Sequence, residues 1–524
     1  GIEDSIQKHY EQTMKGGHNI GNPELVHYLT DHALESVHWL ESIGVKFKDE
    51  VGTATGALWQ RSHYPATPSG NTYIRSFEKY IAAHGNDMKV YTDMDAVSLI
   101  QDKAGRVIGV IAKDNHTGKT TKFMADKGVI LATGGFGANV ALRQKVNTGV
   151  FKDYDLGKGI GCTNFNKSAQ GSGIIMGEKV GAHVIGMSDI QVHPCGTPGT
   201  GLMEMVRTSG RNRLFINKEG NRFVNEGAPR DVLAKAIFAQ PGSTYYVLVN
   251  HLRYPSLDWV DANGAKMKDM IDLGRVVSAP TLDELAKKLN MPAANLKKAV
   301  EDYNGVVAGT YKDPLGFVAN NKADKQMTEG PWYACQKVPT VHHTMGGLEI
   351  NEKAQVLDVK GNPIPHLYSA GEMGGITSEH YQGGTNLAEC IIFGQIAGKN
   401  AAAAKDPLPE YTLAPKVEST PTKLGEVTDL NKETNYETQD NEYIGEGTGM
   451  GGKLVVKVTM DGDKIANVEI LEHSESENIS DPAIEQLPKA IVEANGTEVD
   501  TISGATVTSK AIIEAVNNAL AQVK

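Results

Sequence analysis

The sequence predicts a mixed α/β fold: an α/β domain interrupted by an inserted α+β region, then a small C-terminal α+β domain. Two short apolar stretches, at 129–132 and 364–370, each run directly into small residues, which is typical of buried strands in α/β nucleotide domains. The mixed region between them indicates the insert. Residues 405–435 are rich in Pro, Thr, Lys and Glu without hydrophobic periodicity, so they predict a linker before the last domain.

The N-terminal segment of the chain carries helix and strand patterns in turn. Residues 23–45 have apolar residues at helical spacing and end at Gly44, which predicts one amphipathic helix. Residues 88–132 alternate in period two, with turn signals at "KAGR" and "NHTGK", and predict a meander that ends in a buried apolar strand. That strand runs into Thr133, Gly134 and Gly135, where backbone can approach a cofactor closely.

Later segments complete the α/β pattern. The stretch 281–307 predicts helices within the insert. The second apolar strand, in "IPHLYSAGEMGG", again ends at small residues and is followed by an acid, Glu372. Residues 388–404, rich in Ala and Gly, predict a helix that packs tightly on a sheet.

Composition excludes several classes of function. The net charge of -11 and the lack of a Lys/Arg run argue against a nucleic-acid partner. The four cysteines lie far apart without CxxC spacing, so we expect buried thiols rather than a metal site or disulfides. No apolar run approaches the roughly 20 residues of a transmembrane helix. The chain opens without Met or signal-peptide features, and we expect N-terminal residues to be missing; the compartment stays open.

A glycine motif near residue 450 matches a dinucleotide fingerprint without its context. Gly447, Gly449 and Gly452 satisfy GxGxxG, but "KLVVKVTM", a strand pattern, follows where the fingerprint needs a helix. We therefore interpret these glycines as the entry to a β-hairpin. No strand, GxGxxG and helix unit occurs elsewhere in the chain.

Five ordered motifs across residues 1–404 resemble the flavoprotein fumarate reductase and urocanate reductase family: "GVILATGGFGAN", "QGSGIIMGEKVGA", "NKEGNRFVNEGAPRD", "HHTMGG" and "LYSAGEMGG". The resemblance implies a bacterial α/β FAD-binding domain with an inserted capping domain, acting in the cytoplasm or outside it. Family members begin with a βαβ unit that carries GxGxxG, and the resemblance implies that this sequence starts just after that unit. We accordingly expect an FAD-binding domain made of residues 1–193 and 342–404, a capping or substrate domain (194–341), a linker (405–435) and an FMN-binding domain (436–524).

The C-terminal segment resembles the FMN-binding domain shared with sodium-pumping quinone reductase subunits. "DTISGAT", Asp500 to Thr506, matches its acceptor motif. The resemblance implies that Thr506 carries FMN through a phosphoester bond placed by a flavin transferase. A simple N-cap at Thr506 is the alternative, although Thr508 is the better candidate for a cap of the final helix.

The same resemblance implies a site that reduces a carbon-carbon double bond beside a carboxylate. Such a site needs a hydride, charge stabilisation on the carboxylate and a proton for the other carbon. His193 and His342 match the substrate-binding histidines. Arg230 matches the arginine that clamps the carboxylate and donates the proton, and Glu204 and Arg207 match the relay that resupplies it.

Further family positions concern FAD and the substrate's far end. The residues matching FAD contacts are Thr133, Gly134, Gly135, Gly171, Gly173, Glu372 and Asn386. Where fumarate reductases carry an arginine for the second carboxylate, this chain has Tyr381 and Gln382, so a monoacid resembling urocanate or an arylacrylate ranks ahead of fumarate. His193, however, is the residue of fumarate-type sites, so the choice stays open.

The implied electron path runs from a quinol- or NADH-linked donor through FMN to FAD. Three alternatives remain at this stage: a fumarate reductase proper, a flavin dehydrogenase working in the opposite direction, and an electron-carrier flavoprotein without reductase activity. The set of His193, Glu204, Arg207, Arg230 and His342 favours a reductase.

Overall fold

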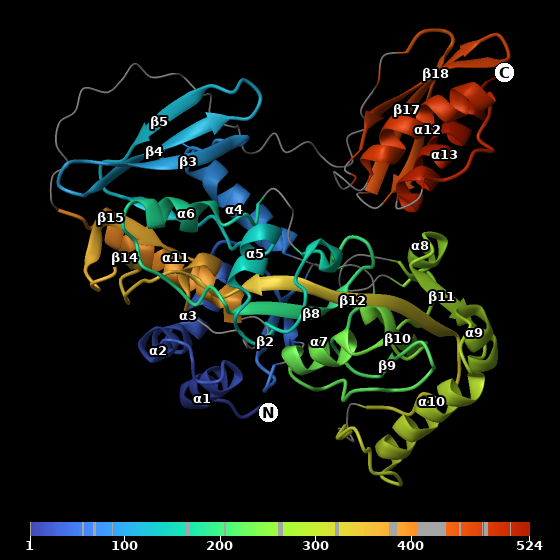
Figure 1. The fold of residues 1–524 in the computed structure, drawn as a ribbon, viewed down its shortest axis with the longest axis horizontal. Coiled ribbons are helices and arrows are strands. Elements are labelled where there is room, and N and C mark those ends of the chain that lie inside the picture. Colours follow the sequence, from blue (N-terminus) through green and yellow to red (C-terminus); the bar gives the residue numbers. More distant parts are fainter. Residues whose placement is uncertain are drawn as a thin grey trace. The chain divides into compact units, whose positions relative to one another are not determined.

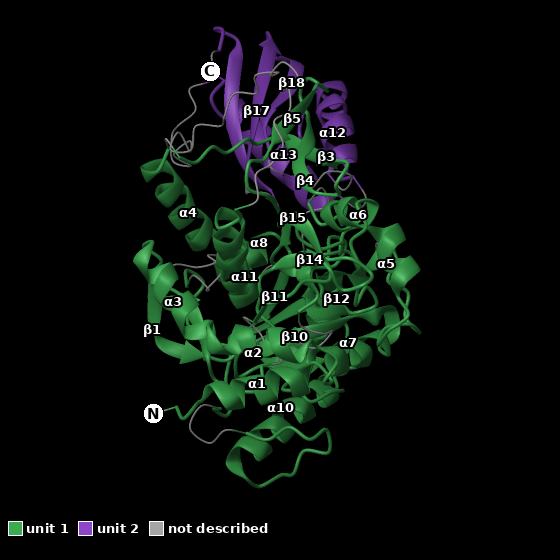
Figure 2. Cartoon of the chain, turned by 90° about the vertical axis from the view of Figure 1, so that its left-hand side faces the viewer, with its two compact units in different colours: residues 1–425 green, residues 426–524 purple. Residues whose placement is uncertain are grey.

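The computed structural model contains two compact units, Gly1–Gly425 and Glu426–Lys524, coloured separately in Figure 2. Each unit has a hydrophobic core of its own. The predicted linker, apart from residue 405, lies outside the described residues. The structure describes residues 2–54, 57–66, 70–85, 87–163, 168–203, 206–259, 266–319, 324–376, 385–405, 436, 438–449, 452–473, 475, 480–502 and 505–523.

The predicted meander is present in the first unit (Figure 1). Strands β3 (Met94–Gln101), β4 (Val107–Asp114) and β5 (Thr120–Met124) pair antiparallel in sequence order. The two connections fall at the predicted "KAGR" and "NHTGK" turns. The meander prediction is confirmed for these three strands, whereas the apolar strand predicted to end it belongs to a separate sheet.

The two apolar stretches form neighbouring parallel strands. β6 (Val129–Leu131) pairs with β15 (Pro363–Ser369), and β14 (Gln355–Leu357) completes the order β14-β15-β6. The predicted small-residue helix, α11 (Thr385–Ala402), packs on this sheet, with Phe393 in its core. β6 is less buried than predicted, because it lies at the edge of the described sheet and Ile130 is 40% exposed.

One predicted helix is in fact two. The span 23–45 forms α2 (Pro23–Asp31) and α3 (Ala33–Ser42), separated at His32, whose φ is -100° and ψ 4°. Both helices contact α11, so the break accompanies packing of the two helices against it. The other N-terminal elements are α1 (Ile6–Gly16), β1 (Phe47–Gly52), β2 (Ser62–Pro65) and α4 (Asn71–Ala83).

The insert is built on a five-stranded sheet. β12 (Trp332–Thr344) pairs first with β10 (Tyr245–Asn250) and β11 (Val276–Ala279), then with β8 (Ile190–Gly196), and β9 (Leu214–Ile216) pairs with β10. Since β8 and β12 run without a break across 193/194 and 341/342, the α/β domain and the insert share both strands (Figure 1).

Helices cover the insert's sheet and connect it to the α/β domain. The predicted stretch 281–307 forms α9 (Leu282–Leu289) and α10 (Ala293–Ala308), whose apolar residues belong to one core cluster. A second cluster includes Leu233 and Ile237 of α7 (Arg230–Phe238). The remaining elements are α5 (Val140–Val146), α6 (Ser172–Lys179), β7 (Val184–Ile185), α8 (Met267–Asp272) and β13 (Gly347–Leu348).

The second unit confirms the hairpin interpretation of GxGxxG. β16 (Glu442–Gly449) and β17 (Gly452–Asp461) pair antiparallel, and β18 (Lys464–Glu472) follows. The helices are α12 (Asp481–Ala494) and α13 (Thr506–Leu520). A Cβ added at Gly445 or Gly447 would lie 1.9 or 2.1 Å from backbone oxygens of α13, so these glycines let the helix lie directly on β16.

The predicted cap at Thr508 is wrong. α13 begins at Thr506 after the N-cap Ala505, so Thr508 lies within the first turn. It is 4% exposed, and its hydroxyl donates to the buried carboxylate of Glu475. The helix starts earlier than the apolar pattern indicates because this buried contact stabilises its first turn.

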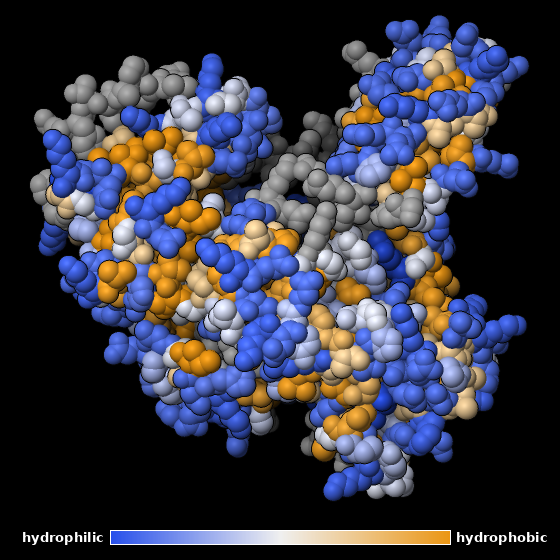
Figure 3. Space-filling view, in the orientation of Figure 1, coloured by the Kyte–Doolittle hydropathy of each residue, from blue (hydrophilic) through white to orange (hydrophobic). Residues whose placement is uncertain are grey.

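Hydrophobic residues are exposed among polar ones at the surface around β14, β15 and α6 (Figure 3). Within the described ranges, no helix has the length and apolar character required to cross a bilayer, and no group of His, Cys, Asp and Glu side chains could hold a metal ion. Cys162, Cys195 and Cys335 are buried as expected, whereas Cys390 is exposed.

Candidate active site

Two predicted histidines meet where β8 and β12 pair. The strands are antiparallel, with Thr340 opposite His193 and irregularities on either side of that pair. The imidazole rings of His193 and His342 lie with centroids 4.9 Å apart at an interplanar angle of 67°. His193 is 3% exposed and His342 is half-buried, and the pair lies where the α/β domain and the insert share a sheet.

Arg230 reaches the same place from a third element. It is the first residue of α7, follows Pro229 and is 6% exposed. Its Nη1 donates to Oε1 of Gln191 at 2.7 Å. Gln191 stands two residues before His193, so both side chains project from the same face of β8. The structure therefore brings a guanidinium, an amide and two imidazoles together.

The histidines of this site are held neutral. The pKa values of His193 and His342 lie well below the usual value of 6.5, first because the rings are removed from water and then because Arg230 is nearby. Burial also lowers the pKa of the adjacent His343, while Glu372 opposes that shift. Arg230 is thus accompanied by neutral hydrogen-bonding rings, an arrangement that suits an anionic ligand.

Two buried side-chain nitrogen atoms at the site make no hydrogen bond within the described residues. Nδ1 of His193 and Nε2 of Gln191 are buried and have no hydrogen-bond partner among the described residues. His342, by contrast, has Nδ1 2.8 Å from the hydroxyl of Thr163. Buried polar atoms are nearly always satisfied, so the first two indicate a polar ligand.

Sequence reasoning missed Gln191 and Thr163. Gln191 could have been identified from the sequence, because the period-two pattern of a strand places residues 191 and 193 on the same face. Thr163 was not, since a lone threonine 179 positions from His342 carries no signal of its own.

The residues predicted to contact FAD converge at the ends of β6 and β15. The Glu372 carboxylate accepts from the backbone N–H of Thr344 at 3.0 Å. A Cβ at Gly135 would lie 2.0 Å from the Thr344 hydroxyl oxygen, so that glycine permits the close approach of these loops. The Gly173 N–H donates to the Thr133 hydroxyl at 3.1 Å. Loops from two adjacent parallel strands and the start of α6 are thereby joined.

This arrangement fits a dinucleotide cofactor. Gly134 has φ +73°, and a Cβ there would meet nothing closer than 3.9 Å, so its backbone borders open space. Gly171, with φ +75°, is the N-cap of α6, and its N–H donates to the Gly135 carbonyl at 3.0 Å. Ligands of α/β folds bind at such carboxyl ends of strands. Asn386 is half-buried in the first turn of α11.

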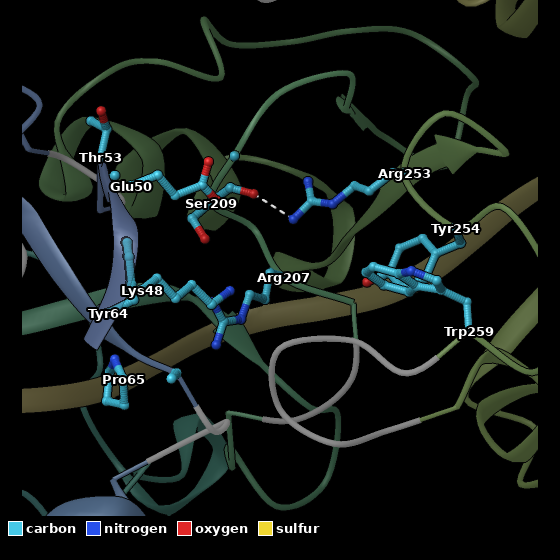
Figure 4. A pocket seen from close by; sticks show the side chains of 13 residues that line it. Lys48, Glu50, Thr53, Tyr64, Pro65, Arg207, Ser209, Arg253, Tyr254 and Trp259 are labelled. Carbon is cyan, nitrogen blue, oxygen red and sulfur yellow. Dashed lines mark hydrogen bonds between the residues drawn. The ribbon is translucent and has the colours of Figure 1, made fainter. Parts of the chain in front are cut away.

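The predicted proton relay and distal pocket are only partly covered by the described residues. Glu204, Tyr381 and Gln382 lie outside them. Arg207 is half-buried in the loop after 206 and lines a pocket together with Tyr64 (Figure 4). Burial raises the pKa of Tyr64, and the charges of Arg207 and Arg230 both oppose that shift. The Tyr64 phenol is therefore within electrostatic reach of both arginines.

The predicted acceptor in the second unit is accessible. Thr506 is exposed at the first position of α13, beside the buried Ala505. The N–H groups and dipole of a helix start favour a phosphate at that position. An exposed hydroxyl there fits a phosphoester-linked FMN.

Comparison with known families identifies both units. Residues 1–387 match the model of the FAD binding domain family, and residues 449–521 match the FMN-binding domain. The chain therefore belongs to the FAD binding domain family and carries an FMN-binding domain at its C-terminal end. These matches agree with the predicted fold class and cofactors.

Relatives extend the comparison. The chain is 36% identical over 412 residues to urocanate reductase of Eggerthella lenta, covering 77% of this chain and 65% of the relative. It is 35% identical over 415 residues to NADH:acrylate oxidoreductase of Vibrio harveyi, covering 76% and 39%. A solved open conformation of a flavocytochrome c3 fumarate reductase superposes with a TM-score of 0.60, 32% identity, and coverage of 77% and 68%. The chain thus spans less than two thirds of these two curated relatives.

Proposed function

We propose that the protein is a flavin-dependent reductase of an α,β-unsaturated carboxylate. The observation that carries the proposal is the convergence of Arg230, Gln191, His193 and His342, with two buried hydrogen-bonding atoms left unused in the described chain. The named activities of the relatives, on urocanate, acrylate and fumarate, support the same substrate class.

The chain's own residues would hold the carboxylate. The Arg230 guanidinium provides charge and a planar pair of donors, and a carboxylate is the matching acceptor. His193 and His342, neutral at pH 7, each contribute one N–H without adding charge repulsion. Arg230 and His193 are buried and His342 is half-buried, which strengthens these interactions and limits the access of water to the reacting carbons.

Reduction requires a hydride at one alkene carbon and a proton at the other. The loops of Thr133, Gly134, Gly173 and Glu372 would hold FAD, which in its reduced form would supply the hydride. Arg230 donates the proton to the second carbon, and Glu204 and Arg207 return one to it from solvent. The double bond gains one hydride and one proton in total, which balances the reaction.

The substrate's far end and the electron path follow the sequence prediction. A monoacid resembling urocanate or an arylacrylate is favoured over fumarate because Tyr381 and Gln382 replace an arginine. Thr506 carries FMN after the action of a flavin transferase, and a quinol- or NADH-linked donor supplies the electrons.

Oxidation of reduced methyl viologen by the flavin-loaded protein tests the proposal. We expect turnover with at least one of acrylate, cinnamate, urocanate and fumarate, detected with identification of the saturated acid. The Arg230→Ala variant should lose this activity while keeping its flavin absorbance. Absence of turnover with every acid, in protein that retains both flavins, would favour an electron carrier instead.

A further inference from the structure

A pocket of about 320 Å³ lies between the β1–β2 hairpin and two loops of the insert (Figure 4). The hairpin contributes Lys48 and Tyr64 to its lining. The loops contribute Arg207, Arg253 and Trp259. This volume is in the range of pockets that bind small molecules, and it exceeds what a three-carbon acid alone would fill.

The pocket is cationic. Figure 4 shows the Lys48 and Arg207 side chains extending toward one another from opposite walls. Glu50 is the one acid among the described lining residues. Two cations facing one cavity repel each other, so an anion between them is stabilised by both.

Hydrogen bonds from two other arginines fix the loop that follows Arg207. The Arg213 guanidinium donates to the backbone carbonyls of Thr208 and Gly210, and also to that of Glu226 at 2.7 Å. Arg253 Nη2 donates to the Ser209 carbonyl at 2.6 Å. The loop that presents Arg207 is thus fixed in advance of binding, which reduces the entropy cost of holding a ligand.

Flat aromatic surfaces border the cations. Tyr254 is 1% exposed and meets Trp259 edge to face, with centroids 5.3 Å apart, which leaves Trp259 39% exposed. The Tyr64 ring lies across Gly52, where an added Cβ would be 2.4 Å from a ring carbon. An anion with a planar ring matches a lining of cations beside aromatic faces.

We propose that this pocket is a second carboxylate-binding site, which captures an aryl-substituted unsaturated acid before it reaches Arg230. Lys48 and Arg207 hold the carboxylate, and Trp259 contacts the aryl ring. The inference rests on the proposed function and narrows its substrate class to acids with a ring at the far end. Tyr64 lines the pocket, and the charges of both Arg207 and Arg230 act on its phenol.

Calorimetric titration of the oxidised, flavin-loaded protein with cinnamate tests binding without turnover. We expect two binding events for the unaltered protein and for the control variant Lys46→Ala, which changes a lysine of the same segment outside the lining. Lys48→Ala should weaken one event about tenfold and leave the other, as expected for loss of one charge-assisted contact. Equal binding by the two variants would overturn the proposal.

Steady-state kinetics separate the capture role from the proposed function. Lys48→Ala should raise KM for cinnamate about fivefold with kcat unchanged. It should also reduce the salt dependence of kcat/KM, because Lys48 is one of the two positive charges proposed to hold the carboxylate. The Lys46→Ala control should change neither quantity. If Lys48→Ala reduces cinnamate with an unaltered KM, the capture site is overturned, but the proposed reductase function stands. Binding that depends on Lys48 in a protein that reduces no acid would overturn both the capture role and the proposed function.

Discussion

Replacing Gln191 with Glu would place a carboxylate on the guanidinium that we propose to bind substrate. Gln191 is 1% exposed, and its Oε1 lies 2.7 Å from Arg230 Nη1, so the new carboxylate would form a buried ion pair with little change in shape. A substrate carboxylate on the other side of Arg230 would then face a like charge. At about 6 Å and an effective dielectric constant near 20, that repulsion is roughly 3 kcal/mol, or about 100-fold in affinity.

The assay is the KM for the best acid substrate, with the calorimetric Kd in the oxidised protein as an independent measure. Gln191→Met is the matched control, since it removes the hydrogen bond without adding charge and should weaken binding about tenfold or less. Thermal unfolding verifies that both variants are folded. A folded Gln191→Glu protein that binds the acid within twofold of the unaltered protein would refute the assignment of Arg230 as the carboxylate ligand.

Three further predictions concern FMN attachment, packing and pH. Thr506→Ala, expressed with a flavin transferase, should lose the fluorescent protein band on a denaturing gel, whereas the exposed Thr501→Ala should keep it. Gly447→Ala should lower the stability of the second unit by roughly 2 kcal/mol or more in thermal unfolding, because its Cβ would meet the backbone of α13, while Gly496→Ala should have little effect. Lowering the pH from 7.5 to 5.5 should destabilise the first unit by up to about 1.4 kcal/mol for each of His193 and His342, because their pKa values are depressed on folding and the unfolded state takes up more protons. His193→Gln should reduce that dependence, and an unchanged pH profile would contradict the prediction.

The regular elements could be predicted because their signals are local. The turns at 103–106 and 115–119 indicated the meander, and small residues after two apolar stretches indicated the strands β6 and β15, whose parallel pairing only the structure shows. The GxGxxG at Gly447 could be assigned to a hairpin because a strand pattern followed it. Strands with alternating residues and turns with glycine carry this information within a few positions.

The rest depends on contacts between distant segments. His32 carries no helix-breaking signal, and the break between α2 and α3 follows from packing on α11, more than 350 residues later. Thr163 is paired with His342 only because the chain returns to the same sheet. Tyr64 reaches the pocket because Gly52, on the opposite strand, leaves room for its ring. The positions and contacts of such residues depend on tertiary packing, which leaves no signal in the neighbouring sequence.

Turnover of the Arg230→Lys variant tests the central claim most directly. Lysine keeps the positive charge and a donor near Gln191, so acid binding should persist, but it lacks the planar pair of donors and is displaced from the reacting carbon. The account predicts that kcat for acid reduction falls by at least about 1,000-fold, the loss of a positioned proton donor, while Kd changes far less. A kcat within tenfold of the unaltered protein would show that the proton comes from elsewhere.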